Sequence, residues 1–573
     1  MLDVVVPLDD ALIAAWRARV LRAGARLGWV NRQAVARRHA GGASLALAAP
    51  SDQLFLATEV NEWALCAALI ERDPVLWCGL EEALIAQALQ AARNAENPAA
   101  GLQPTIEESA ALARFERLAS RESLPQLRAL LDAAAARGLP HVVDESDLTL
   151  GAGVGGRNFS LAALPHVADV DWGKLCDIPT AIVTGSNGKT TTVRLLAACA
   201  RAHGWRAGYN CTDGVFLDDE ALAAGDYSGP AGARMVLRER RAQAAILETA
   251  RGGILRRGIA VSQVNTAVIT NVSSDHFGEY GIDDLAGLAE VKLAVAAAVG
   301  PNGLLVLNAD DAQLRAQAPG LTRRFGRSPP VGWFAVGAEQ ATLREYRSRG
   351  AATCGVHQGR LWLSHGGADH DLGPISAMPL SMAGIAAYNV ANMAGAALAA
   401  VALGIAPTTI AAVLAKFGSS LNDNPGRMMR FEVGGIKILI DYAHNPDGLR
   451  GFLTVAEHLR GAGRLGLLLG HAGNRKDADI EELARVAAEF QPDLIVVKED
   501  EAHLRGRAPG EIPRILRAEL QRLGFPDSAL PVANSEVEAA RHALAWARPG
   551  DVLALPLHAP SARAVVVALL EDR

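Results

Sequence analysis

Residues 184–192 constrain the fold of this chain more than any other stretch. They read Thr-Gly-Ser-Asn-Gly-Lys-Thr-Thr-Thr, and they join the apolar run 179–183 to a segment with helical periodicity, 193–200. The two glycines permit positive φ and close backbone approach, so that consecutive N–H groups can face phosphate oxygens at a helix N-terminus. Lys189 offers a positive charge to the terminal phosphates, and the Thr190 hydroxyl offers a ligand to Mg²⁺. A strand, a glycine-rich turn and a helix in this order predict a phosphate-binding loop for ATP.

One position departs from the general pattern of such loops. The pattern has a glycine five residues before Gly188, where this chain has Val183. An ordinary glycine-rich turn between a strand and a helix is the alternative, although the flanking periodicity favours the phosphate loop. The loop residues expected to bind the nucleotide are Gly185, Ser186, Asn187, Gly188, Lys189, Thr190 and Thr191.

The composition is typical of a soluble protein with several domains. Its 573 residues are too many for one hydrophobic core; half of them are hydrophobic and 21% are charged. The formal net charge of −6 gives no support for a nucleic-acid partner. The six cysteines are scattered without metal-ligand spacing, which favours reduced thiols in a cytoplasmic protein.

Neither a signal peptide nor a membrane span is expected. No basic region precedes the apolar run at the N-terminus. The most membrane-like stretch, residues 390–405, is largely alanine, contains Asn392 and is shorter than a bilayer span. We therefore expect a buried helix there.

Alternating apolar runs and helical patterns predict an α/β protein of three domains. Residues 1–175 form an N-terminal α/β domain without a readable catalytic signature, in which 53–57 is expected to be a strand. Residues 176–426 form a central ATP-binding domain with a parallel sheet covered on both faces. Residues 427–573 form a smaller, Rossmann-like domain. The glycine-rich stretch 151–158 lacks a following Lys-Thr pair and helix, and is expected to link two domains.

Polar residues follow the expected strands of the central domain. The strands expected in the second and third domains are 180–184, 244–248, 266–270 and 303–307, then 437–441, 464–469, 494–498 and 552–556. Ligands of open α/β sheets bind at the carboxyl ends of strands. Glu248 ends the second strand, and Asn271, Asp275 and His276 follow the third. These side chains suit Mg²⁺ beside Thr190, although a lone His276 is as often a helix cap or a loop residue.

Several spaced motifs together resemble the Mur ligase family of ATP-dependent amide ligases. The motifs are 185–190, Glu248, 271–276, Lys292, 388–392, 426–428 and 441–446, in the order of that family. The phosphate loop without a glycine at 183 is the form that this family uses. Within the family, residues 212–214, 248–255, 498–500 and 504–507 most resemble the Mur-like C-terminal half of the cyanophycin synthetases. Those proteins carry an additional ATP-grasp domain, for which the roughly 170 residues before the phosphate loop are too few.

The resemblance implies a role for each motif residue. Lys189, His276 and Lys292 would be catalytic; Thr190, Glu248, His276 and a carbamylated Lys292 would hold Mg²⁺, expected as two ions. Asn389 and Asn392 would contact adenine, and Arg427 and Asp441 would reach phosphate and ribose from the third domain. On composition alone Lys292 would be a solvent-facing helix lysine. The residues expected to bind the other substrates are Thr212, Asp213, Arg251, His444, Asn445, Arg475 and Asp477.

The implied reaction is ADP-forming ligation of a carboxylate and an amine through an acyl phosphate. The expected partners are small amino acids or peptides, and Asp477, Glu499 and Asp500 suggest an amine substrate with a basic side chain. A small-molecule kinase or other NTPase is one alternative. A non-catalytic nucleotide-binding relative is another, and a homo-oligomer stays open.

Overall fold

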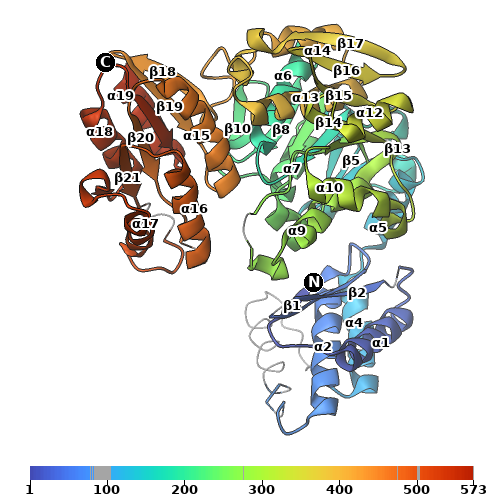
Figure 1. The fold of residues 1–573 in the computed structure, drawn as a ribbon. Helices are drawn as coiled ribbons and strands as arrows, with labels where there is room; N and C mark the ends of the chain where they lie inside the picture. The colour runs from blue at the N-terminus through green and yellow to red at the C-terminus, as the bar shows by residue number, and fades with distance from the viewer. Residues whose placement is uncertain are drawn as a thin grey trace. The chain divides into compact units, whose positions relative to one another are not determined.

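The structure, a computed structural model, describes residues 1–31, 33–39, 41–77, 79–80, 82, 105–274, 277–473, 475–499 and 504–571. Contacts divide the chain into two compact units. The first is Met1–Asp177 with Phe277–Asp283, and the second is Ile178–His276 with Asp284–Arg573. Figure 1 labels their elements from the blue N-terminus to the red C-terminus.

In its described residues, the first part of unit 1 has helices beside a three-stranded antiparallel sheet of order β1-β3-β2. Its elements are β1 (Leu2–Val4), α1 (Asp10–Arg26), β2 (Ala34–His39), β3 (Gly42–Leu47), α2 (Leu54–Arg72) and α4 (Glu108–Glu122). The strand expected at 53–57 is wrong, because this apolar run is the first turn of α2. Leu56, Val60 and Trp63 continue its buried face with helical spacing, and the longer periodicity overrides the short apolar run.

The second part of unit 1 is α5 (Pro125–Ala135) and an antiparallel sheet of β4 (His141–Val143), β5 (Asp147–Leu150) and β6 (Arg157–Ser160). The glycine-rich stretch 151–158 is a turn between β5 and β6, so the linker expected there is wrong. Gly151 has a φ of +76°, and a Cβ there would lie 2.2 Å from the carbonyl oxygen of Gly155. The glycines serve tight packing of this turn.

A short segment of the chain between two elements of unit 2 belongs to unit 1. Residues Phe277–Asp283 include the 3₁₀ turn η5 (Glu279–Gly281). The Arg37 guanidinium of β2 donates hydrogen bonds to the carbonyl oxygens of Tyr280 and Gly281. Residues 277–283 therefore pack within the N-terminal unit, although in the sequence they lie between β12 and α9.

The core of unit 2 is an eleven-stranded sheet of order β10-β9-β8-β11-β7-β12-β13-β14-β15-β16-β17. The strands from β8 to β15 pair in parallel, and the two edges are antiparallel. The strands are β7 (Thr180–Thr184), β8 (Ala207–Cys211), β9 (Gly214–Leu217), β10 (Glu220–Ala224), β11 (Ala244–Glu248), β12 (Val264–Ile269), β13 (Val299–Asn308), β14 (Val331–Gly337), β15 (Thr353–His357), β16 (Arg360–His365) and β17 (Ala368–Pro374). The helices are α6 (Lys189–Ala202), α7 (Pro230–Arg238), α8 (Arg251–Arg257), α9 (Leu285–Lys292), α10 (Ala312–Gln317), α11 (Leu321–Phe325), α12 (Ala341–Ser348), α13 (Ala387–Ala402) and α14 (Pro407–Leu414).

Strand β7 lies in the middle of this sheet and is buried on both faces. Ala181 and Val183 join the core that includes α6 and α13. Side chains alternate along a strand, so Ile182 points to the opposite face, and it is also fully buried. The predicted parallel sheet with two covered faces is confirmed.

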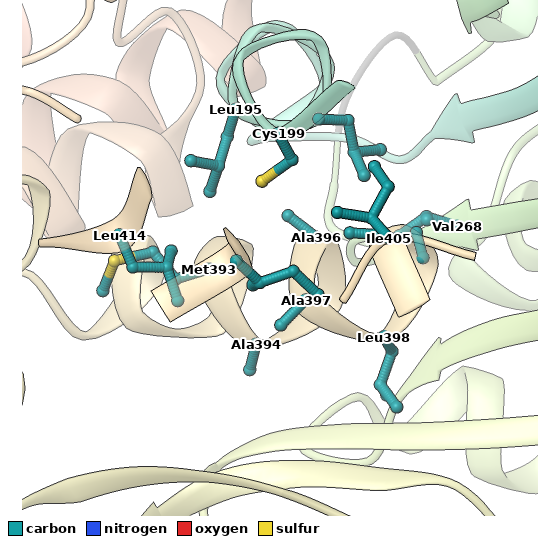
Figure 2. Close-up of a cluster of buried hydrophobic side chains, with 14 of the residues drawn as sticks. Leu195, Cys199, Val268, Met393, Ala394, Ala396, Ala397, Leu398, Ile405 and Leu414 are labelled. Carbon is teal, nitrogen blue, oxygen red and sulfur yellow. The ribbon is translucent and has the colours of Figure 1, made fainter. Parts of the chain in front are cut away.

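The helix expected at 390–405 is α13, and it is buried against α6. Figure 2 shows Met393, Ala396 and Ala397 of α13 in one cluster with Leu195 and Cys199 of α6. The small alanine side chains let the two helices approach closely, which explains an apolar helix without a membrane. Of the helices in the described ranges, none combines the length and the hydropathy needed to cross a bilayer.

The C-terminal part of unit 2 is a six-stranded sheet of order β18-β19-β23-β20-β21-β22, in which only β18 is antiparallel. Its strands are β18 (Met429–Val433), β19 (Ile436–Asp441), β20 (Leu465–Leu469), β21 (Leu494–Lys498), β22 (Val532–Ala533) and β23 (Val552–Pro556). Its helices are α15 (Pro446–Arg460), α16 (Asp477–Glu489), α17 (Glu511–Arg522), α18 (Glu536–Trp546) and α19 (Pro560–Glu571), drawn in orange and red in Figure 1. The predicted second α/β sheet is confirmed.

Candidate active site

The phosphate loop lies between β7 and α6, where the sequence predicts it. Gly185 and Gly188 have φ angles of +150° and +82°. A Cβ at 185 would lie 1.8 Å from Thr270 Oγ1, and one at 188 would lie 2.2 Å from Asn392 Oδ1. Only glycine fits at either position. The Lys189 ammonium donates to the carbonyl oxygens of Gly185 and Ser186, each at 3.0 Å, so it lies over the loop.

The segment that follows β12 holds the loop in shape. The backbone N–H of Ser186 donates to the carbonyl of Asn271 at 2.9 Å, and that of Asn187 donates to the Asn271 side-chain oxygen at 2.9 Å. The Ser186 hydroxyl donates to the Ser273 carbonyl at 3.0 Å. Asn271 and Ser273, which follow the third predicted strand, therefore fix the conformation of the phosphate loop.

Glu248 ends β11 beside the loop because β11 pairs with β7 in parallel, with Glu248 opposite Val183. Its carboxylate is fully buried and accepts hydrogen bonds from the hydroxyls of Thr190, at 2.8 Å, and Thr212, at 3.2 Å. Burial raises the pKa of the Glu248 carboxyl, and the nearby Lys189 ammonium partly opposes this shift. One carboxylate and two hydroxyls are hard oxygen donors of the kind that Mg²⁺ prefers, so these residues fit the ion.

The other predicted metal ligands are not assembled in the part of the chain that the structure describes. Asp275 and His276 lie outside the described residues. Lys292 is the last residue of α9 and is buried, not solvent-facing as composition alone suggests. Over the described ranges, no group of three or more His, Cys, Asp and Glu side chains is arranged to hold a metal.

A cavity of about 380 Å³ opens above the loop. The predicted residues that line it are Ser186, Asn187, Gly188, Lys189, Thr190, Thr191, Thr212, Glu248, Asn389, Asn392, Arg427, Asp441 and His444. Its volume falls within the usual range for small-molecule sites. Residues from both sheets of unit 2 therefore face one cavity, as the resemblance implies for a nucleotide.

Arg427 and Asp441 enter this cavity from the C-terminal part. The Arg427 guanidinium stacks on the Tyr442 ring, 4.2 Å from its centroid. Asp441 accepts a hydrogen bond from the Met428 backbone N–H at 2.8 Å. Burial raises the pKa of the Asp441 carboxyl, while Arg427 lowers it. Asp441, the last residue of β19, and its neighbour Tyr442 thus hold Arg427 and Met428 beside the cavity.

Two of the predicted substrate residues have partners inside the chain. Asp213 pairs with Arg194 of α6 at 3.1 Å and with Arg563 of α19 at 3.4 Å, and it does not line the cavity. Burial alone would raise the pKa of the Asp213 carboxyl, but Arg427, Arg194 and Arg563 hold it below its usual range. Asn445 exchanges two hydrogen bonds with Asn187. Both residues join the two sheets of unit 2.

Arg507 organises the loop that follows β20, a role that the sequence does not reveal. Its guanidinium donates to the carbonyl oxygens of Gly473, at 3.0 Å, and Arg475, at 2.6 Å. It also pairs with Asp477 at 2.7 Å and Glu511 at 2.6 Å. Asp477 therefore has a cation within the chain.

The remaining predicted substrate residues lie near strand ends. Glu499 accepts the Gly510 backbone N–H at 2.9 Å ahead of α17, whereas Asp500 lies outside the described residues. Arg475 is buried in the loop after β20, and Arg251 is buried as the first residue of α8. The structure thus leaves their contact with a substrate as a prediction.

Replacing Arg507 by lysine is expected to loosen the 473–477 loop. An ammonium cannot reproduce the guanidinium's bonds to two carbonyls and two carboxylates, and each lost charged bond costs about 1.5–3 kcal/mol. Hydrogen exchange of peptides covering 470–477 should accelerate while α18 stays protected. The matched control is Arg541→Lys, at an exposed position of α18. Unchanged exchange in the loop would contradict this role of Arg507.

A buried polar cluster at the edge of the C-terminal sheet is a second feature that sequence reasoning missed. Lys498 at the end of β21 pairs with Glu536 and donates to the Pro556 carbonyl at 2.5 Å. Glu536 accepts the backbone N–H groups of His558 and Ala559. Burial, helped by the Lys498 charge, holds the pKa of the His558 imidazole well below its usual value, so the ring is neutral. The cluster ties β21, α18 and the chain after β23 together.

The fold and the site define a class of protein: a nucleotide-binding enzyme whose phosphate-loop sheet and second α/β sheet share one cavity. Two family models match the chain, the Mur ligase middle domain over residues 183–400 and the Mur ligase, glutamate ligase domain over 426–555. The chain belongs to the Mur ligase family, whose members are ATP- and Mg²⁺-dependent, ADP-forming ligases that make carbon–nitrogen bonds.

Individual relatives agree with this assignment. The chain is 34% identical to a cyanophycin synthetase of Nostoc sp. over 388 residues, which are 68% of this chain and 42% of that protein. It is also 34% identical over 384 residues to the UDP-N-acetylmuramoyl-L-alanyl-D-glutamate–2,6-diaminopimelate ligase of Alkalilimnicola ehrlichii, covering 65% of this chain and 69% of that one. The chain thus spans less than half of the cyanophycin synthetase. A structure of E. coli FolC, in complex with DHPP and ADP, shares the fold with a TM-score of 0.52 at 18% identity, over 69% of this chain and 89% of FolC.

Proposed function

We propose that the chain joins a carboxylate of an amino acid or peptide to an amine, using ATP and releasing ADP and phosphate. The observation that carries this proposal is the single cavity lined by Lys189 and Glu248 from the central sheet and by Arg427 and Asp441 from the C-terminal part. A kinase would also need Lys189 and Glu248, to bind ATP and its metal ion. A ligase must also enclose an activated intermediate, for which a second sheet at the same cavity is suited.

The chemistry assigns a task to each group. The substrate carboxylate attacks the γ-phosphate of ATP, which gives an acyl phosphate and ADP. Lys189 offsets the repulsion between these two anions, and the Glu248, Thr190 and Thr212 oxygens would hold Mg²⁺, which supplies further charge neutralisation. The amine then attacks the acyl carbon; phosphate leaves, and the amine loses a proton. Arg427, stacked on Tyr442, is placed to bind phosphate from the other side of the cavity.

The finer assignments extend this proposal. Domains 1–175, 176–426 and 427–573 would serve carboxylate binding, ATP binding and amine binding, respectively. Two Mg²⁺ ions with a carbamylated Lys292 are proposed from the family resemblance. The burial of that lysine supports the proposal, since a buried ammonium is costly and the neutral amine is the form that reacts with CO₂ to give a carbamate, an anion that Mg²⁺ would bind. Arg251 would hold a substrate carboxylate, and Arg475 and His444 would face the amine.

Two of the carboxylates from which a basic amine is expected have partners within the chain. Asp477 is paired with Arg507, and Glu499 is bonded to the Gly510 N–H, so neither carboxylate is left to bind a cationic side chain by itself.

A coupling screen tests the proposed function. Purified chain with Mg²⁺-ATP is offered amino acids and short peptides, singly and in pairs, while ADP release and product mass are followed. A ligase gives ADP release that requires a carboxylate and an amine, with a product heavier by their sum minus water. Phosphorylated product from one substrate alone would instead favour the kinase. ATP binding without turnover on any pair would favour the non-catalytic alternative.

A further inference from the structure

A reciprocal pair of amides joins the phosphate loop to the C-terminal part. The Asn187 Nδ2 donates to Asn445 Oδ1 at 3.1 Å, and the Asn445 Nδ2 donates to Asn187 Oδ1 at 2.9 Å. Asn445 is 2% exposed and does not line the cavity above the loop. It therefore acts on the cavity only through the residues it touches.

Each member of the pair is fixed by its own surroundings. The Asn187 carbonyl accepts the Thr270 hydroxyl at 2.5 Å and the Asn271 amide at 3.1 Å, and the Asn187 side-chain amide also donates to the Ser273 hydroxyl at 3.1 Å, so both backbone and side chain are held. Asn445 is the N-cap of α15, where its Oδ1 also accepts the Gly448 N–H at 2.9 Å. The pair thus connects the loop that would cradle phosphate to the first turn of α15.

Two other contacts between the two sheets are of a different kind, one ionic and one a ring packed against a helix. The Asp213–Arg563 pair is ionic, and the Tyr388 ring packs so closely on α15 that a Cβ at Gly451 would lie 3.0 Å from Tyr388 Cδ1. The amide pair carries no net charge, so it does not titrate and salt screens it little. The amide pair is directional, because both of its bonds need the two side chains in one orientation.

We propose that Asn445 is a positioning residue that couples closure of the C-terminal part to nucleotide at the phosphate loop, through its amide pair with Asn187. The inference rests on the proposed nucleotide binding. Nucleotide at the loop favours the loop conformation that presents Asn187 to Asn445, and so favours the arrangement in which α15 is engaged. By linkage, engagement of α15 strengthens nucleotide binding by the same factor.

Substitution of Asn445 by serine separates this role from its capping role. Serine is an equally good N-cap, so α15 keeps its first turn, but its side chain is too short for the amide pair. Mg²⁺-ADP should bind the full-length variant roughly tenfold more weakly, the scale of a typical coupling between sites. The loss should persist at high salt, and the thermal midpoint should stay near that of the wild type. The matched control is Asn534→Ser, at an exposed asparagine of the same part.

Titration calorimetry of Mg²⁺-ADP gives distinct outcomes. Wild-type chain that binds no nucleotide would overturn both the proposed function and this inference. Wild-type binding together with equal binding by the Asn445→Ser variant would overturn the inference alone. A test without any variant is hydrogen exchange of the wild type, in which Mg²⁺-ADP should slow exchange at residues 447–450. No change in that first turn of α15 would also overturn the proposal.

Discussion

Replacing Lys189 by alanine is expected to lower the rate of ADP release by roughly 10²- to 10³-fold, the scale for loss of one preorganised charge at a reacting centre. The Lys189 ammonium lies over the loop, bonded to the carbonyls of Gly185 and Ser186. No other lysine lines the described cavity, so no second ammonium is present there to replace it. The rate is measured with the substrate pair that the coupling screen identifies.

The same substitution should leave the fold intact. The loop is held by Asn271 and Ser273, which bond its backbone and the Ser186 hydroxyl without using the lysine. The alanine variant should therefore fold as the wild type does, and its thermal midpoint should fall only by what the Lys189 charge contributes beside the buried Glu248 carboxylate. Lys416→Ala, at an exposed position, is the matched control and should keep full activity. Activity of the Lys189→Ala variant near the wild-type level would contradict the ligase mechanism.

Buried parallel strands are the part of the fold that the sequence predicts best. The runs 180–184, 244–248, 494–498 and 552–556 coincide with β7, β11, β21 and β23. Strands buried on both faces read as near-continuous apolar runs, and a polar residue (Thr184, Glu248 or Lys498) marks the end of three of these four. The antiparallel strands β10, β16 and β17 were not expected, because partly exposed strands carry mixed side chains and a weak pattern.

The same contrast holds for the candidate site: contacts between neighbouring strands can be predicted from sequence, and contacts between the two sheets cannot. Glu248 can be placed beside the phosphate loop from sequence, since carboxyl ends of neighbouring parallel strands meet at one edge. The pairs that join the two sheets cannot be predicted in this way. Asn187 and Asn445 are 258 residues apart in the chain, and Asp213 and Arg563 are 350 apart. Sequence motifs single out Asn187, Asn445 and Asp213, but they give no partner for any of them.

Replacing Glu248 by glutamine is expected to change activity and stability in opposite directions. Activity should fall by about 10²-fold or more, because the only carboxylate among the oxygens proposed to hold Mg²⁺ is removed. Glutamine keeps an oxygen for the Thr190 hydroxyl and has the same shape. It also carries no charge, whereas the wild-type carboxylate is fully buried and bonded only to neutral hydroxyls in the described structure. Without Mg²⁺, the variant should therefore unfold at a higher temperature than the wild type at neutral pH.

The pH dependence of that gain has a definite sign. The folded pKa of Glu248 is raised above the usual value of 4.5. Between these two pKa values the folded state binds more protons than the unfolded state, so wild-type stability falls as pH rises. The stability of the Glu248→Gln variant lacks this fall with pH, because glutamine does not titrate. The difference in thermal midpoint should grow from about pH 4.5 upward and level off above the folded pKa. A variant less stable than the wild type across this range would contradict a penalty at Glu248.

Lys189 allows a second test of the free-energy cost of burying the charged Glu248 carboxylate. Its ammonium lowers the pKa of the Glu248 carboxyl and so relieves part of the cost of the buried charge. In a Lys189→Ala background that relief is lost, and Glu248→Gln should stabilise the chain more than it does in the wild type. A double-mutant cycle of thermal midpoints at neutral pH measures the difference, which should vanish at low pH where the carboxyl is protonated. Equal gains in both backgrounds would mean that the two charges, though both face the cavity, are not coupled.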